Sequence, residues 1–337
     1  MKGGITLLGI IFCSFVCALS STNFVNPIIP NEDNPDPGVV FYDGSYYVVT
    51  TIGDLSPSKF KIHRSQDLQN WEFTGYVFPP DHLPRWANPV SSFWAPELHI
   101  INGQFRVYYT ARELVTGRLC IGVGAADNIL GPYTDKGSPI VKNTTVGSID
   151  ASVMSLEDGT YYLLWKEDGE SNVPPQPTWI WAQQLSYDGL TAIGNKYALT
   201  SNTLDWEGNL IEAPWIIKQG DWYYLFYSGH GYCDGKYAVG VARSKDPIGT
   251  YEKKGDPILV SDQAWAGPGH CSVVQNVQDD NKWVMIFHAW NQGQVCGSNS
   301  RYLMIDSITW SDDEWPVMGG MYQDSSKPYE RIHRFRV

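Results

Sequence analysis

The feature that most constrains the fold is a strand-turn-strand unit that recurs along the whole chain. In each copy a polar turn, usually containing Gly, leads into alternating aromatic and β-branched residues, a pattern typical of β-hairpins. The copies recur at intervals of about 60 residues and cover residues 43–51, 102–111, 158–166, 220–228 and 279–290. Such regular recurrence predicts a propeller or a similar repeat array.

The segments around each unit complete the pattern of a propeller blade. A short apolar run precedes every turn and predicts an innermost strand; these runs begin at Asp36, Ala95, Asp150, Glu212 and His270. Further on, a third strand ends in an S-x-D or related turn before an aromatic residue, as in 60–71, 121–133, 238–251 and 302–315. Helical periodicity is nearly absent, and no linker splits the chain. We therefore predict an all-β fold, a single five-bladed β-propeller over residues 21–337.

The first twenty residues form a separate segment. Lys2 supplies a positive start, residues 5–19 are mostly apolar, and the small residues Ser20 and Ser21 follow. This is the pattern of a signal peptide, and it is too short and wrongly flanked for a membrane span. We predict a signal peptide over residues 1–20, no membrane anchor and a secreted protein.

Charge and cysteine content narrow the partners and the compartment. The 36 acidic residues outnumber the 24 basic ones, for a net charge of -12. A surface of this kind repels phosphate, which argues against nucleic acid and anionic membranes as partners. Outside the signal peptide the cysteines are Cys120, Cys233, Cys271 and Cys296. We expect one disulfide among the last three in an oxidising compartment, and a buried free thiol at Cys120.

The starts of the innermost strands carry the chemistry, because in a propeller they point into the mouth of the central channel. Asp36, Asp150, Glu212 and His270 occupy these positions. Acids that converge on one funnel raise one another's cost of ionising, so their pKa values separate. One protonated and one ionised carboxyl suit glycoside hydrolysis. Glu212, in an apolar run, is the predicted acid with a raised pKa; Asp36 is the base, and Asp150 orients or tunes the acid. Activity is then expected to be bell-shaped in pH, on the acid side of neutral.

Five short motifs, in this order and spacing, resemble glycoside hydrolase family 43. They are N-P-D-P at 34–37, W-A-P-E at 94–97, S-I-D-A at 148–151, E-A-P at 212–214 and G-P-G-H at 267–270. The resemblance implies a five-bladed propeller and an inverting mechanism on α-L-arabinofuranosyl or β-D-xylosyl linkages of arabinan, arabinoxylan or xylan. It also implies Asp36 as general base, Asp150 as pKa modulator and Glu212 as general acid.

Other residues follow from the resemblance or from their chemistry. Arg301 resembles the last-blade arginine that reaches the carboxylates or the substrate, for which its guanidinium fork is suited. His270 resembles a histidine beside a bound cation, commonly calcium, but one histidine is no calcium site by itself. We predict no required cofactor and at most a structural Ca²⁺ near His270. We expect Glu97 to be structural. Candidate sugar platforms are Trp94, Trp215, Trp181 and Tyr232, although most aromatic residues must pack between blades.

Several functions stay open on the sequence alone. An exo-acting arabinofuranosidase or β-xylosidase is the leading prediction, and segments 81–93 and 173–178 are candidates to wall off its pocket. An endo-1,5-α-L-arabinanase would need an open groove instead. A non-catalytic carbohydrate-binding propeller is disfavoured because all three carboxylates are present. A retaining fructosidase-type propeller is disfavoured because N-P-D-P and E-A-P stand where it has N-D-P-N and E-C.

Overall fold

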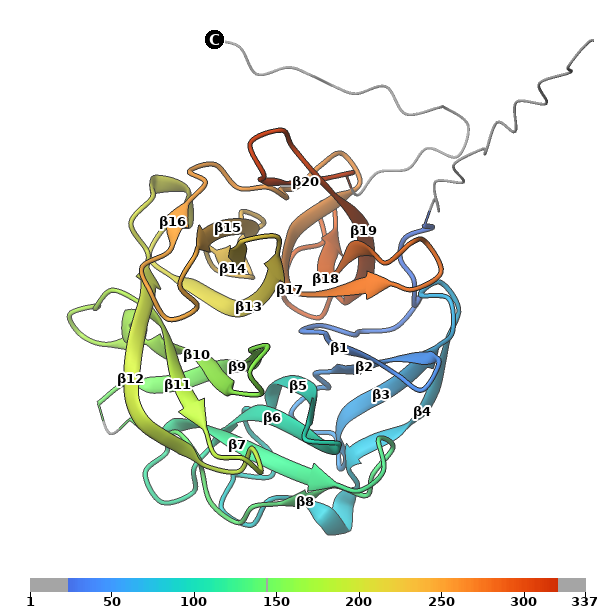
Figure 1. The fold of residues 1–337 in the computed structure, drawn as a ribbon. Coiled ribbons are helices and arrows are strands. Elements are labelled where there is room, and N and C mark those ends of the chain that lie inside the picture. The colour runs from blue at the N-terminus through green and yellow to red at the C-terminus, as the bar shows by residue number, and fades with distance from the viewer. Residues whose placement is uncertain (1–23, 144, 321–337) are drawn as a thin grey trace, which may run out of the picture.

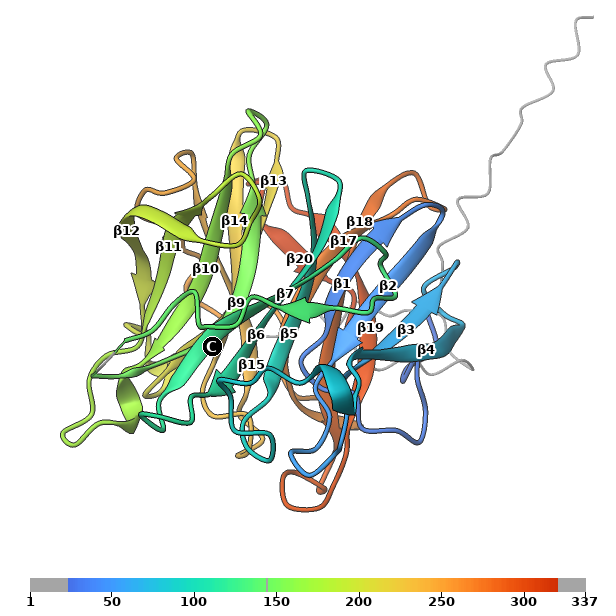
Figure 2. The ribbon, with the colours of Figure 1, turned by 90° about the horizontal axis from the view of Figure 1, so that it is seen from below.

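The fold is a ring of five antiparallel four-stranded sheets around one axis (Figure 1). The computed structural model describes residues 24–143 and 145–320, so the predicted signal peptide lies outside the described residues. Seen from the side, the blades stand around the axis with their strands inclined to it (Figure 2). Within the described ranges, no helix has the length and apolar character needed to cross a bilayer.

In each blade the strands follow one another outward from the axis in chain order. The innermost strands are β1 (Gly38–Tyr42), β5 (Trp94–Ile101), β9 (Gly147–Ser155), β13 (Ile211–Gln219) and β17 (Trp265–Asn276). The second strands are β2 (Ser45–Thr50), β6 (Gln104–Arg112), β10 (Tyr161–Asp168), β14 (Trp222–Gly229) and β18 (Lys282–Asn291). The third strands are β3 (Lys59–Ser65), β7 (Leu119–Ala126), β11 (Trp179–Leu185), β15 (Ala238–Ser244) and β19 (Arg301–Trp310).

The outermost strands vary most. They are β4 (Trp71–Phe78), β8 (Thr134–Asp135), β12 (Ala192–Ser201), β16 (Glu252–Lys253) and β20 (Pro316–Met318). Three single-turn 3₁₀ helices, η1 (Pro80–His82), η2 (Gly169–Ser171) and η3 (Asp205–Glu207), lie in the connections. The predicted five-bladed propeller is confirmed. The sequence analysis found no third-strand pattern for the third blade, where the structure has β11. The outermost strand of this blade, β12, is largely exposed.

The core lies between the blades, because both faces of each sheet are covered by a neighbouring sheet. Five clusters of buried side chains fill the five blade-to-blade interfaces. Between the first two blades, for example, Phe60 lies against Tyr109 with 5.6 Å between ring centroids. All six residues of β2 are buried. Strands covered on two faces read as continuous apolar runs, which explains the dense aromatic stretches in the sequence.

The ring is closed by the start of the described chain. The amide of Ile28 donates to the carbonyl of Leu303 at 2.9 Å, and the amide of Asn34 donates to that of Arg301 at 2.9 Å. These residues pair with the beginning of β19, whose other end pairs with β20. The first and last blades are thereby joined, and β1 lies next to β17, the innermost strand of the fifth blade.

The cysteines behave as predicted. Cys233 and Cys296 form a disulfide with 5.0 Å between their Cα atoms. This bond joins the segment after β14 in the fourth blade to the segment after β18 in the fifth. Cys120 is a buried free thiol, and so is Cys271.

Candidate active site

Every innermost strand carries one residue in left-handed backbone conformation near its entry into the ring. The φ angles are 55° at Asp36, 47° at Ala95, 56° at Asp150, 54° at Ala213 and 47° at His270. In blades two to five the pairing with the second strand shifts register at this point, which marks a β-bulge. Bulges of this kind re-aim side chains and are common beside active sites. Here they direct functional side chains toward the axis.

The re-aimed residues meet in one pocket. Since its lining comes from all five blades, the pocket lies on the axis of the ring. It is lined by Asp36, Trp94, Ile149, Asp150, Glu212, Tyr232, Tyr237, His270 and Arg301. The structure thus brings together the three predicted carboxylates, together with the predicted Trp94, Arg301 and His270.

Asp36 is held ionised by its neighbours. Its Oδ1 lies 2.9 Å from Nη1 of Arg301 and 3.6 Å from Nδ1 of His270. Burial alone would raise the pKa of Asp36, but the positive charge of Arg301, helped by nearby imidazoles and the Thr51 hydroxyl, outweighs burial and lowers that pKa to about 2. Asp36 is therefore a carboxylate throughout the range in which a glycosidase works, as a base must be.

The pKa of Asp150 is shifted in the opposite direction although this residue is equally buried. Burial raises its pKa well above the usual range, and the adjacent Glu212 carboxylate raises it further, while Lys166 opposes the shift. His270 stands between the two aspartates, because its Nδ1 is also 4.0 Å from Oδ2 of Asp150. The raised pKa of Asp150 fits the tuning role that the sequence predicted for it.

Glu212 is bonded through both oxygens. Nζ of Lys166 lies 3.0 Å from its Oε2, and the Tyr237 hydroxyl donates to its Oε1 at 2.7 Å. Lys166 is itself buried and also pairs with Asp168 at 3.1 Å and Glu170 at 2.5 Å. Sequence reasoning missed both Lys166 and Tyr237.

Lys166 occupies a position that repeats around the ring. In each second strand, one polar side chain near the end reaches the next blade. Thr51 Oγ1 accepts from the Ala95 amide at 2.9 Å, Thr110 Oγ1 from Asp150 at 3.1 Å, Ser228 Oγ from His270 at 2.8 Å, and His288 Nδ1 from Asp36 at 3.2 Å. Lys166 is the third-blade member and reaches Glu212. The final polar residue of each second-strand repeat was the sequence signal that could have identified it.

Two predicted platforms are not part of the pocket. Trp215 is buried between blades four and five, donates through Nε1 to the carbonyl of Val273 at 3.1 Å and stacks on His99. Trp181 lies on β11 of blade three under Nζ of Lys196, at 3.9 Å from the ring centroid. The substrate-binding prediction for Trp215 is therefore corrected: its side chain packs against Val273 of the fifth blade and His99 of the second, away from the pocket lining. Trp94 and Tyr232 do line the pocket.

Glu97 lies two residues beyond Ala95 on β5, below the pocket. It is 3% exposed, and its Oε2 has no hydrogen-bond partner among the described residues. Its side chain packs on Gly38, where an added Cβ would come within 2.6 Å of that oxygen. Burial raises the pKa of Glu97 well above its usual range, with smaller contributions from the charges of Asp150 and Asp36. A buried carboxyl packed in this way agrees with the structural role that we expected.

The residues near His270 do not form a calcium cage. Within 24–143 and 145–320, no three or more His, Cys, Asp or Glu side chains are arranged to hold a metal ion. Calcium takes six to eight oxygen ligands, and His270 offers a nitrogen that faces two carboxylates. A cation here would have to take most of its ligands from water, and it remains a prediction of the resemblance only.

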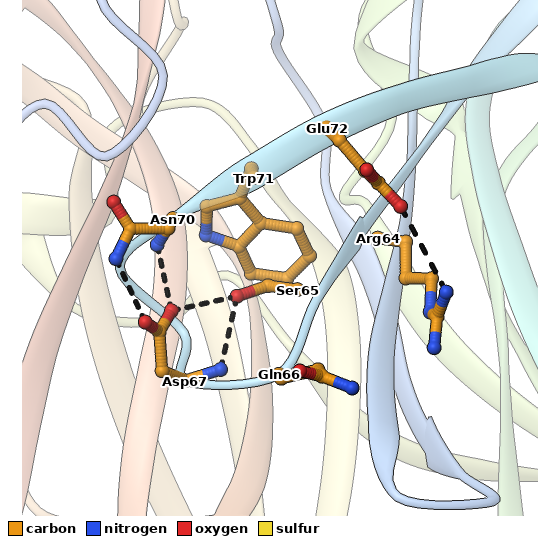
Figure 3. Close-up of a pocket in the computed structure, with 7 residues that line it drawn as sticks. All are labelled: Arg64, Ser65, Gln66, Asp67, Asn70, Trp71 and Glu72. Carbon is orange, nitrogen blue, oxygen red and sulfur yellow. Dashed lines mark hydrogen bonds and ion pairs between the residues drawn. The ribbon is translucent and has the colours of Figure 1, made fainter.

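A second pocket lies at the outer edge of the first blade and has a structural explanation (Figure 3). It surrounds the turn between β3 and β4, where Oδ1 of Asp67 accepts from the Ser65 hydroxyl at 3.0 Å and the Asn70 amide at 2.7 Å. The same S-x-D arrangement joins Ser186 to Asp188 in blade three and Ser244 to Asp246 in blade four. These carboxylates hold turns, in contrast to those on the axis.

A five-bladed propeller whose axial pocket sets Asp36, held by Arg301, opposite the neighbouring carboxyls of Asp150 and Glu212 has the construction of a glycoside hydrolase. Comparison with known proteins agrees: the model of the family described as "Glycosyl hydrolases family 43" matches residues 24–316. The chain belongs to this family, whose members are inverting glycoside hydrolases.

Individual relatives differ in activity. The chain is 25% identical over 305 residues to the extracellular endo-α-(1→5)-L-arabinanase 1 of Bacillus subtilis, covering 85% of this chain and 88% of that one. It is 23% identical over 357 residues to the extracellular exo-α-(1→5)-L-arabinofuranosidase ArbA of Cellvibrio japonicus, covering 95% and 93%. A crystal structure of a thermostable family-43 glycoside hydrolase superimposes with a TM-score of 0.79 at 27% identity, covering 88% of this chain and 96% of that chain.

Proposed function

We propose that this hydrolase is secreted and removes single α-L-arabinofuranosyl or β-D-xylosyl residues from the ends of plant cell-wall polysaccharides. The observation that carries the exo assignment is the wall of the axial pocket. Trp94, Ile149 and Tyr232 stand around the carboxylates and come from three different blades. The lining residues include none from 81–93 or 173–178, the two segments that the sequence offered as candidates to wall it off. An enclosed pocket accommodates a chain end, whereas a chain interior needs a groove open at both sides.

The carboxylates divide the reaction between them. Asp36, ionised by Arg301, accepts a proton from a water molecule as that water attacks the anomeric carbon. The bond from that carbon to the leaving oxygen breaks, and Glu212 donates a proton to this oxygen. Asp150, whose pKa is raised by burial and by the charge of Glu212, lies beside the acid and tunes it. Attack from the face opposite the leaving group inverts the anomeric centre.

Hydrolysis of nitrophenyl α-L-arabinofuranoside and nitrophenyl β-D-xylopyranoside tests this proposal. We expect turnover of at least one, and monomer as the product from linear arabinan or xylan. Glu212→Gln should lower kcat by about 10²- to 10⁴-fold while the protein still binds the sugar. Glu157→Gln is the matched control, because this glutamate pairs with Lys218 on the surface.

Different outcomes contradict different parts of the proposal. Folded protein that turns over neither glycoside would exclude the assigned sugars. Oligomers as first products would favour the endo-arabinanase reading. Binding that is unchanged in Glu212→Gln, without turnover in either protein, would favour a carbohydrate-binding propeller. Secretion is tested separately, since the N-terminus of the exported protein should lie near residue 21.

A further inference from the structure

One segment at the rim of the pocket contacts the predicted acid directly and contacts the arginine that binds the predicted base. Residues 230–237 connect β14 to β15 and carry two of the pocket-lining tyrosines. Tyr237 donates directly to Oε1 of Glu212 at 2.7 Å. The ring of Tyr232 lies 4.9 Å from the guanidinium carbon of Arg301, and Arg301 binds Asp36 at 2.9 Å. This segment therefore links the acid side of the pocket to the base side.

The two tyrosines are held in different ways. Tyr237 is 1% exposed and stacks on His288 with 5.8 Å between ring centroids, so packing fixes it. Tyr232 is 45% exposed and has little packing to hold its ring in place. An exposed side chain on a connecting segment is mobile unless its backbone is tied down.

The backbone at Tyr232 is tied to the fifth blade. Its carbonyl accepts from Nε1 of Trp290 at 2.9 Å, and the next residue, Cys233, forms the disulfide with Cys296. Cys296 lies in the segment that leads from β18 into β19, and β19 begins with Arg301. The disulfide thus connects, by short stretches of chain, the two side chains that form this wall of the pocket.

We propose that the Cys233–Cys296 disulfide positions Tyr232 against Arg301, and that Tyr232 is a substrate-binding residue for the terminal pentosyl unit. This inference rests on the proposed function for the identity of the sugar. A ring held in place before binding costs less conformational freedom when the sugar arrives, and that gain appears as affinity. Because Tyr237 is fixed by packing, loss of the disulfide should weaken binding more than it slows bond cleavage.

Kinetics of the disulfide variant test the inference. C233S/C296S should raise KM by about 3- to 10-fold and leave kcat within about twofold. Tyr232→Ala should raise KM similarly, and the combined variant should show much less than the product of the two effects, because both remove one contact. Tyr232→Phe, which keeps the ring, should raise KM less than Tyr232→Ala does. Reductant should reproduce the effect in the wild type and do nothing to C233S/C296S, since Cys120 and Cys271 are already free thiols.

Hydrogen exchange measured by mass spectrometry tests, without a substrate, whether the disulfide holds the rim segment in place. Peptides covering 230–237 and 292–302 should exchange faster in C233S/C296S, while those of the second blade stay unchanged. Unchanged exchange in the rim segments would overturn the inference whatever the substrate. Faster exchange with an unchanged KM would overturn the substrate-binding role of Tyr232. If the wild type hydrolyses neither glycoside, the proposed function is wrong, and so is the sugar-binding role of Tyr232. Hydrogen exchange still tests whether the disulfide positions the rim segment.

Discussion

At the scale of single residues, two aspartates have opposite pKa shifts because their charged neighbours differ. Asp36 and Asp150 are both 7% exposed and both have left-handed backbones. Burial raises the pKa of either carboxyl, but at Asp36 Arg301 together with the nearby imidazoles and the Thr51 hydroxyl outweighs burial, whereas at Asp150 the charge of Glu212 adds to it. Burial alone therefore does not assign an acid or a base, and the nearest charge does.

Arg301→Met should narrow the pH range of activity from the acid side. Without the guanidinium, burial dominates and the pKa of Asp36 rises from about 2. The base is then protonated at higher pH, so the acid limb of the kcat/KM profile should move upward by at least one pH unit, about the effect of one close charge. The measurement is kcat/KM between pH 3 and 8.

A surface arginine provides the comparison for this experiment. Arg85 is exposed and far from the pocket lining, so Arg85→Met should leave the profile in place. The acid limb of the kcat/KM profile could instead remain at the wild-type pH in Arg301→Met, with activity lowered equally at all pH values. That result would show that Arg301 binds substrate without setting the ionisation of Asp36.

At the scale of the strand, a bulge and its hydrogen-bond partner on the preceding blade form one repeated unit. The left-handed residue breaks the ladder and frees an amide, and in four blades a side chain from the preceding blade's second strand accepts it. A buried amide without a partner costs about 1–3 kcal/mol. The unit therefore both aims the site residue and ties neighbouring blades together.

Thr110→Val should test this unit at the third blade. Valine matches the shape of threonine but cannot accept from the Asp150 amide, so we expect a loss of about 1–3 kcal/mol in the free energy of unfolding and a lower kcat. Denaturant unfolding and steady-state kinetics measure the two effects. Thr134→Val, at an exposed site on β8, should change neither. Equal effects of the two substitutions would mean that the Thr110 bond does not hold the bulge.

At the scale of the whole molecule, the closed ring buries titratable groups both at the axis and within the blades. Burial raises the pKa of Asp306 to about 7, and it raises that of Glu170 to about 7 as well. The pKa values of Asp150 and Glu97 are raised further. In the unfolded chain all four would ionise near pH 4. The folded state therefore binds more protons on these groups than the unfolded state does.

Above about pH 6.5 the carboxyls with raised pKa values set the direction in which folding stability changes with pH. A carboxyl whose folded pKa is raised stabilises the protein while it is protonated in the folded state, and this contribution is lost as the pH rises through that pKa. Buried histidines with lowered pKa values, such as His99 and His288, act in the opposite direction, but only below about pH 6.5, where unfolded imidazole is protonated.

Thermal stability should accordingly fall as the pH rises from 6.5 to about 7, the folded pKa of Asp306 and Glu170, and the contribution of these two groups to the slope should vanish above that pH. Each raised carboxyl contributes up to about 1.4 kcal/mol per pH unit between its unfolded and its folded pKa. Calorimetric Tm values in buffers of equal ionic strength measure the slope. Asp306→Asn should flatten it, because asparagine does not titrate, although its single amide oxygen can replace only one of the two carboxyl oxygens that accept from Ser307 and Gly320. A Tm that is level or rises over this range would show that these groups are not protonated in the folded protein.

Much of the fold and half of the site could be read from the sequence. The five aromatic repeats predicted the blades because a strand covered on both faces needs apolar side chains throughout. The motifs at the strand starts located Asp36, Asp150 and Glu212 because the same register recurs in every blade. Trp215 was misplaced because an apolar residue beside an acid reads the same whether it faces the axis or the next blade.

The sequence by itself determined the repeat, the number of blades and the residue types that reach the axis, since these follow from local periodicity. Only the tertiary structure decided which partner each carboxyl has: Arg301 for Asp36, and Lys166 and Tyr237 for Glu212. It also decided that the disulfide joins Cys233 to Cys296 beside Tyr232. These contacts join residues that are far apart in sequence, and the charge state of a buried group depends on what lies a few ångströms away in space, which closure of the ring alone establishes.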